Sequence, residues 1–100
     1  MAGGRAQAEE TLAALGPLRQ LAAEVRAYPL RLLEQVCAQA DARGGTVPDH
    51  LLRLDPYLGD AALRALVEGG YIAREAGERA IYVYAPTAQG RALVEQARAR

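Results

Sequence analysis

A chain of 100 residues builds one compact domain with a single hydrophobic core. Its 12 basic residues, all of them Arg, balance 12 acidic residues, and a neutral charge counts against strong nucleic-acid binding, which depends on phosphate contacts. One Cys excludes an internal disulfide, no apolar run is long enough to cross a membrane, and the N-terminus lacks a signal-peptide core, so we expect a cytoplasmic protein with no membrane partner.

The first expected helix runs from about Gln7 to Ala27, with an interruption at residues 16–17, which are Gly and Pro. Its apolar side chains recur at helical spacing and form one stripe: Leu15, Leu18, Leu21, Ala22 and Val25. A stripe of this kind needs a packing partner. We expect it to pack on the C-terminal helix, at least partly across a two-fold dimer interface.

The second expected helix spans about residues 29–42 and ends at the glycine pair 44–45. Its buried stripe is Leu33, Val36, Cys37 and Ala40. A short third helix is expected over about residues 47–54, with Thr46 as its N-cap. This short helix should bury two side chains, Leu51 and Leu54.

The fourth expected helix begins at Tyr57 or Gly59 and ends at Glu68, before a second glycine pair. Asp55 closes the preceding helix and is also a candidate cap for this one. The inner face is formed by Leu58, Ala62, Leu63 and Leu66. This phase leaves the polar side chains of the helix on the outside.

After the fourth helix the apolar pattern alternates, which predicts a β-hairpin over about residues 71–85. Thr87 should cap a last helix that runs to about Arg98. The order of helix, helix, short helix, helix, hairpin and helix is that of a winged helix-turn-helix. We therefore expect a mainly α fold with a small β-hairpin wing and extra terminal helices. Within this single domain, residues 1–28 are an N-terminal helical extension for dimerisation and residues 29–100 are the winged helix domain.

Residues 63–74, LRALVEGGYIAR, look like the end of a recognition helix that runs into a wing. Residues 79–91, RAIYVYAPTAQGR, run from an Arg through an alternating strand to a Thr, two residues and a Gly. This second stretch resembles the second wing strand and following helix of MarR-type and related bacterial transcriptional regulators. The resemblance covers roughly residues 30–94 and implies a dimeric, repressor-like protein whose terminal helices pair the subunits.

The resemblance implies a recognition helix at about residues 57–68. Helical spacing places Tyr57, Asp60 and Arg64 on its outward face. In the major groove Arg reads guanine and Tyr reaches phosphate. The alternative is a solvated helix face that carries an Asp60–Arg64 ion pair four residues apart.

The wing, at about residues 71–85, carries Arg74 and Arg79 on either side of its tip. Such side chains lie along the minor groove or the phosphates, and a cross-strand ion-pair ladder with neighbouring Glu residues is the alternative. His50 and Arg53 are expected on the exposed side of the third helix, which crosses the phosphate backbone in this fold. A plain surface histidine is the alternative for His50.

Cys37 lies within an apolar stripe, so we interpret it as a small buried hydrophobe, with a redox switch as the alternative. One Cys and one His do not make a usual zinc site, and the chain has no phosphate-binding glycine loop. We expect no cofactor and no enzymatic activity. The predicted function is a homodimeric, DNA-binding transcriptional regulator with double-stranded DNA as its partner. The alternative is a winged-helix module that binds proteins and not DNA; no effector can be named from the sequence.

Overall fold

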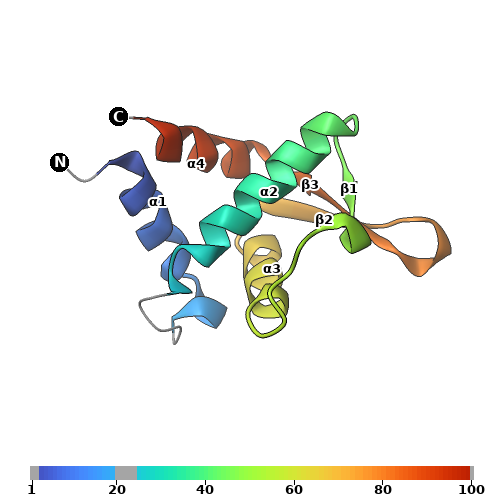
Figure 1. The fold of residues 1–100 in the computed structure, drawn as a ribbon, viewed down its shortest axis with the longest axis horizontal. Coiled ribbons are helices and arrows are strands. Elements are labelled where there is room, and N and C mark those ends of the chain that lie inside the picture. Colours follow the sequence, from blue (N-terminus) through green and yellow to red (C-terminus); the bar gives the residue numbers. More distant parts are fainter. Residues whose placement is uncertain (1–2, 20–24, 100) are drawn as a thin grey trace.

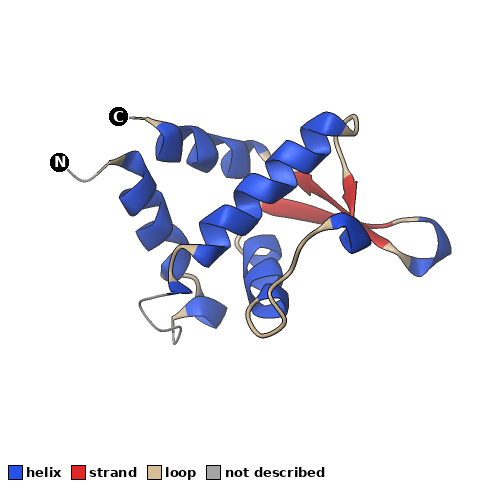
Figure 2. Cartoon of the chain, in the orientation of Figure 1, coloured by secondary structure: helices blue, strands red, loops and turns tan. Residues whose placement is uncertain are grey.

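The computed structural model describes residues 3–19 and 25–99 of the chain. These residues form four α-helices and a three-stranded antiparallel sheet (Figure 1). The helices are α1 (Gly4–Ala13), α2 (Tyr28–Ala42), α3 (Gly59–Glu68) and α4 (Ala88–Arg98). The strands are β1 (Val47–Pro48), β2 (Ile72–Ala76) and β3 (Tyr82–Pro86), in the order β1-β3-β2. The prediction of a mainly helical chain with a small β-hairpin is confirmed, and Figure 2 shows the sheet confined to one end.

Helix α2 is the centre of the fold, because it packs against α1, α3, α4 and β3. Its apolar side chains recur every three or four residues, as a helix with one buried side requires. The buried members are Leu30, Leu32, Leu33, Val36, Cys37 and Ala40. The helix ends where predicted: Gly44 has a φ of 89°, and the Gly45 N–H donates to the Ala40 carbonyl oxygen at 2.7 Å.

The predicted third helix over residues 47–54 is wrong. Val47 and Pro48 form strand β1, which pairs with Tyr84 and Val83 of β3. Proline lacks an N–H donor and fits an edge strand, while the β-branched Val47 is fully buried beneath it. Only one turn of 3₁₀ helix follows, at Asp49–Leu51.

Because this segment is not a helix, the predicted Thr46 cap and part of the predicted core are also wrong. Pro48, and not Thr46, precedes the 3₁₀ turn, and no side chain caps it. At Leu52 the backbone becomes extended, with a ψ of 135°, which changes the phase of the side chains that follow. As a result Leu52 is buried, Leu51 is half-buried and Leu54 is 38% exposed.

Helix α3 has the predicted phase, with Ala62, Leu63 and Leu66 buried against the core. Its start is set by Asp55, whose carboxylate accepts the Tyr57 and Leu58 N–H groups at 2.8 and 2.9 Å. Leu58 itself is half-buried. These bonds order the turn that precedes the helix, but the N-cap position of α3 is Leu58 and no side chain caps it, so the possible Asp55 cap is not observed.

Thr87 and Gly90 fix the start of α4 against the end of α3. The Thr87 hydroxyl accepts the Gly90 N–H at 3.0 Å, which confirms the predicted cap. The same hydroxyl donates to the Gly70 carbonyl at 2.6 Å. A side chain at Gly90 would collide with the Tyr71 carbonyl oxygen. The positions of Thr87 and Gly90, three residues apart, therefore follow from the packing of α4 against the end of α3.

Helix α1 packs on α4 and α2 of the same chain. Gly4 lies against the Gln96 carbonyl of α4, and the Arg5 guanidinium makes two bonds to the Glu34 carboxylate at 2.9 and 3.0 Å. The predicted break is confirmed, since α1 ends at Ala13 and one 3₁₀ turn begins at Gly16, but the predicted continuation of the helix to Ala27 is wrong, because residues 25–27 are not α-helical.

The stripe of the first predicted helix therefore finds packing partners within one chain. Leu18 is buried and Leu15 is half-buried, whereas Leu21 and Ala22 lie outside the described residues. The molecule measures 45 × 27 × 19 Å, with both termini at the end opposite the β2–β3 hairpin (Figure 1). Among the described helices, none combines the length and apolar character needed to cross a bilayer.

Candidate functional site

All the residues predicted to face DNA are exposed, and they lie on three segments. They are His50, Arg53, Tyr57, Asp60, Arg64, Arg74 and Arg79. Tyr57 stands out, because 90% of its surface is exposed at the start of α3. Exposure of a large aromatic side chain to this degree leaves its ring available for a partner.

The structure brings three of these residues together. Asp60 and Arg64 of α3 and Arg74 of β2 line one shallow depression, with Tyr84 of β3 as part of its wall. Leu63 and Val67 of α3 complete the lining. We call this feature the α3–hairpin depression. It joins the outer face of the helix to the hairpin in one surface.

The predicted ion pair on α3 is present. The Arg64 guanidinium lies 2.9 Å from the Asp60 carboxylate, one helical turn away. Both side chains are well exposed, so the pair contributes only about 0.3–0.5 kcal/mol to stability. An energy this small leaves Arg64 free to exchange Asp60 for a stronger acceptor.

Arg74 is held in place by aromatic rings. Its guanidinium carbon lies 4.6 Å from the centre of the Tyr82 ring, within the range of a cation–π interaction. Burial raises the pKa of the Tyr84 hydroxyl, and the nearby Arg74 charge opposes part of this rise. Among the described residues, no ion pair involves Arg74 or Arg79, so the alternative of a cross-strand charge ladder is not observed.

Arg79 occupies the tip of the hairpin in a left-handed conformation, with a φ of 59°. Residues with a Cβ rarely adopt this conformation, because it crowds the following carbonyl oxygen. Its side chain is exposed. The tip therefore carries a strained residue whose charge points away from the core.

His50 and Arg53 are exposed as predicted, but they do not lie on a helix of the predicted length. His50 belongs to the single 3₁₀ turn, and Arg53 follows in extended backbone. The Gln35 side chain of α2 holds this backbone in place, since it accepts the Arg53 N–H and donates to the Arg53 carbonyl. Because Gln35 and Arg53 are far apart in the sequence, these two hydrogen bonds could not be predicted from the local sequence.

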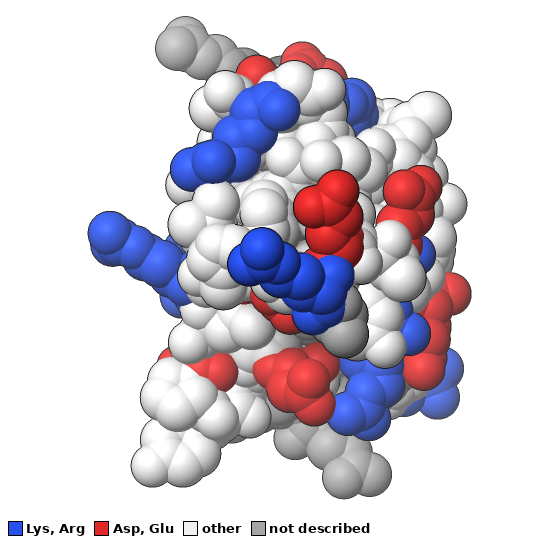
Figure 3. Space-filling view, turned by 90° about the vertical axis from the view of Figure 1, so that its right-hand side faces the viewer, with Lys and Arg blue, Asp and Glu red and all other residues white. Residues whose placement is uncertain are grey.

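Charges of both signs are mixed on the hairpin end of the molecule. Figure 3 views this end and shows arginine side chains interleaved with acidic ones. The arginines thus do not gather into one uniformly positive face on this side. Any anionic partner must be bound by a few separate guanidinium groups rather than by a broad positive field.

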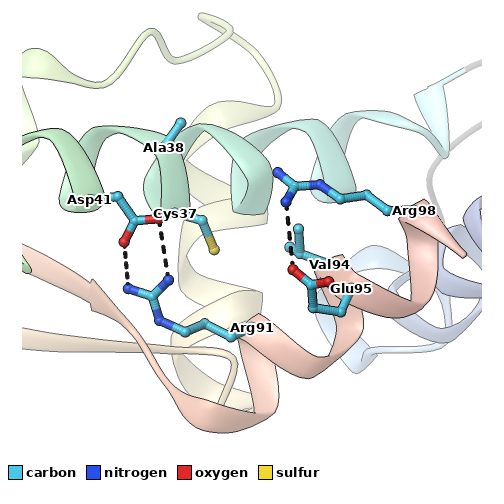
Figure 4. A pocket seen from close by; sticks show the side chains of 7 residues that line it. All are labelled: Cys37, Ala38, Asp41, Arg91, Val94, Glu95 and Arg98. Carbon is cyan, nitrogen blue, oxygen red and sulfur yellow. Dashed lines mark hydrogen bonds and ion pairs between the residues drawn. The ribbon is translucent and has the colours of Figure 1, made fainter.

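A second concave site lies between α2 and α4 and was not predicted. Its lining combines the Cys37 thiol with Asp41 of α2 and Arg91 and Arg98 of α4 (Figure 4). Burial raises the pKa of the Cys37 thiol, whereas the hydrogen bond from Arg91 lowers the pKa of the Asp41 carboxyl. Cys37 is buried, as predicted, and also forms part of a cavity wall.

No family model, curated protein or solved structure matches this chain. The geometry of the two sites therefore carries the functional argument. The α3–hairpin depression presents guanidinium groups that can donate to phosphates or base edges. The α2–α4 cavity is larger and has charged walls.

Proposed function

We propose that the chain is a winged helix-turn-helix protein that binds double-stranded DNA and regulates transcription. The order of α2, β1, the Asp49–Leu51 turn, α3 and the β2–β3 hairpin supports this fold, as does the sheet order β1-β3-β2. In such proteins the helix before the hairpin enters the major groove. Helix α3 and the hairpin have that relation in the chain.

The observation that carries the proposal is the shared position of Arg64 and Arg74. One guanidinium comes from the outer face of α3 and the other from β2, and both line the same depression. A duplex that rests on this surface meets the helix and the hairpin together. Arg64 is then the base reader, since Arg bonds the N7 and O6 acceptors of guanine.

The remaining candidates have supporting roles. Arg53, Arg74 and Arg79 contact phosphates, and Tyr57 donates its hydroxyl to a phosphate oxygen. Asp60 is a positioning residue, because it holds Arg64 at 2.9 Å until a base replaces it. Few phosphate contacts are expected for a chain without net charge.

We also propose that the protein acts as a homodimer through the layer formed by α1 and α4. This layer lies at the end of the molecule away from the hairpin, so pairing there leaves both copies of α3 accessible (Figure 1). A two-fold axis through it would present two recognition helices to half-sites about one helical turn, ~34 Å, apart.

A salt series of DNA binding tests the proposal. Binding of the wild type to fragments of the source genome is measured between low and moderate salt, beside Arg79→Ala, Arg64→Gln and the control Arg31→Gln. Arg31 is exposed on α2 and lies outside the depression. Arg79→Ala should weaken binding to every fragment and flatten the salt slope by about one unit. Arg64→Gln should cost about 1–3 kcal/mol at one base position only.

No measurable affinity of the wild type for any fragment at low salt would overturn the DNA proposal. The second candidate function, a protein-docking module, is favoured by the exposed large apolar side chains of the described residues. These are Leu54, Tyr57 and Tyr82. If the chain is such a module, Tyr57→Ala and Tyr82→Ala should abolish binding of the protein partner. DNA binding, in contrast, should depend mainly on the arginines.

A further inference from the structure

The cavity between α2 and α4 has a volume of about 240 Å³. A single water needs only about 10–15 Å³ of space open to its centre, so the cavity has room for a small organic molecule. Its floor is formed by the buried side chains of Cys37 and Val94, and the exposed Ala38 lies at its edge. The floor belongs to the faces by which the two helices pack, so the cavity is part of the fold.

Two arginines of α4 stand on the walls, and they differ in how firmly they are held. Arg91 makes two bonds to the Asp41 carboxylate of α2, at 2.8 and 3.4 Å (Figure 4). Arg98 has one longer ion pair to Glu95, at 3.5 Å and within its own helix. Arg91 is therefore held against Asp41. Most of the donors of Arg98, in contrast, have no acceptor among the described residues.

The Cys37 side chain forms the inner wall of the cavity. It is only 6% exposed, makes no hydrogen bond within the described residues, and points into the space between the two arginines (Figure 4). Its position places a soft, weakly polar surface opposite the guanidinium of Arg98. The lining also holds the Asp41 and Glu95 carboxylates, each paired with an arginine, and the less firmly held Arg98 beside an apolar floor suits an occupant that is anionic at one end and apolar at the other.

We infer that the α2–α4 cavity binds a small organic carboxylate. The carboxylate accepts bonds from Arg98, and the apolar part lies against Val94 and Cys37, beside the Arg91–Asp41 pair. A carboxylate suits this position because a guanidinium binds it through two parallel bonds. The site is separate from the α3–hairpin depression, so it does not rest on the proposed DNA binding.

The full chain is titrated with pentanoate and followed by two-dimensional amide NMR at neutral pH. Pentanamide is the uncharged match, and sodium chloride controls for ionic strength. We expect saturable shifts at the cavity residues with a Kd on the order of 1 mM, as suits so small a ligand. Arg98→Gln should weaken binding about tenfold, whereas the control Arg31→Gln should not change it.

A second measurement uses the one thiol of the chain. Alkylation of Cys37 by N-ethylmaleimide, followed by mass spectrometry, should slow about tenfold when pentanoate is present at ten times its Kd. Arg98→Gln should reduce this protection to about twofold at the same pentanoate concentration, because its Kd is about tenfold weaker. Shifts that do not saturate, equal shifts with pentanamide, or unchanged binding by Arg98→Gln would each overturn the inference.

Discussion

Arg79 combines an unfavourable backbone conformation with the charge that we propose contacts DNA, and substitutions can test the two separately. Its φ of 59° is disfavoured for a residue with a Cβ, and glycine removes that cost. We predict that Arg79→Gly is about 1 kcal/mol more stable than Arg79→Ala, because both lose the charge and only glycine loses the strain. Urea unfolding of the two variants measures the difference. Equal stabilities would show that the hairpin tip relaxes without cost.

Leu66 tests the core at the same scale. The side chain is fully buried on the inner face of α3, at the position predicted from helical spacing. Leu66→Ala should lower the free energy of unfolding by about 2–5 kcal/mol, since it removes buried methyl groups and leaves a void. Urea titration provides the value, with the exposed Leu54→Ala as the comparison. A loss no larger than that of Leu54→Ala would mean that this face is not the core.

At the scale of elements, the junction of α3, β2 and α4 depends on Gly90. Alanine normally stabilises a helix relative to glycine by about 1 kcal/mol. At Gly90 the added methyl group would meet the Tyr71 carbonyl, so we predict that Gly90→Ala destabilises the protein by about 1–3 kcal/mol. The reciprocal control is Ala92→Gly, at an exposed position of α4, which should cost about 1 kcal/mol. Thermal unfolding of both variants checks the signs, and a stabilised Gly90→Ala would contradict this packing.

Elements with strong local signals were predictable from the sequence. Helix α2 has a sustained apolar period and a glycine stop, and α4 has a Thr cap, so their bounds agree with the prediction to within a residue. Strand β1 has no such signal, because Val47 pairs with Tyr84, far along the chain. A two-residue strand is stabilised by its partner and not by its own sequence, so the third helix was predicted in its place.

The same limit applies to the sites. The outward positions of Asp60 and Arg64 follow from the period of α3 alone. Their meeting with Arg74 and the bond of Arg91 to Asp41 need the tertiary fold, since each joins separate elements. The exposure of individual residues was therefore predictable, whereas the depression and the α2–α4 cavity were not.

On the scale of the whole molecule, the charge balance sets the character of any DNA complex. The chain has as many acidic as basic side chains, and the two kinds are mixed on the hairpin end (Figure 3). About three phosphate contacts per chain give a salt slope of only about −3. A single copy then binds weakly, and two copies on adjacent half-sites bind more tightly because the second contact becomes intramolecular.

The proposed dimer is the last prediction. Apolar side chains of α1 and α4 are buried within one chain, so an interface through this layer uses small and polar side chains such as Ala92 and Gln96, both exposed. We expect sedimentation equilibrium at micromolar and higher concentrations to give twice the chain mass of 10.7 kDa. Ala92→Arg should return the mass to one chain, because a two-fold axis brings the new charges of both copies into the same interface. The variant should stay folded, since position 92 is exposed in the monomer, and should lose only the concentration-dependent stabilisation that the dimer gives to the wild type. A mass of one chain for the wild type throughout this range would reject the dimer and leave the DNA-binding surface to act as a single copy.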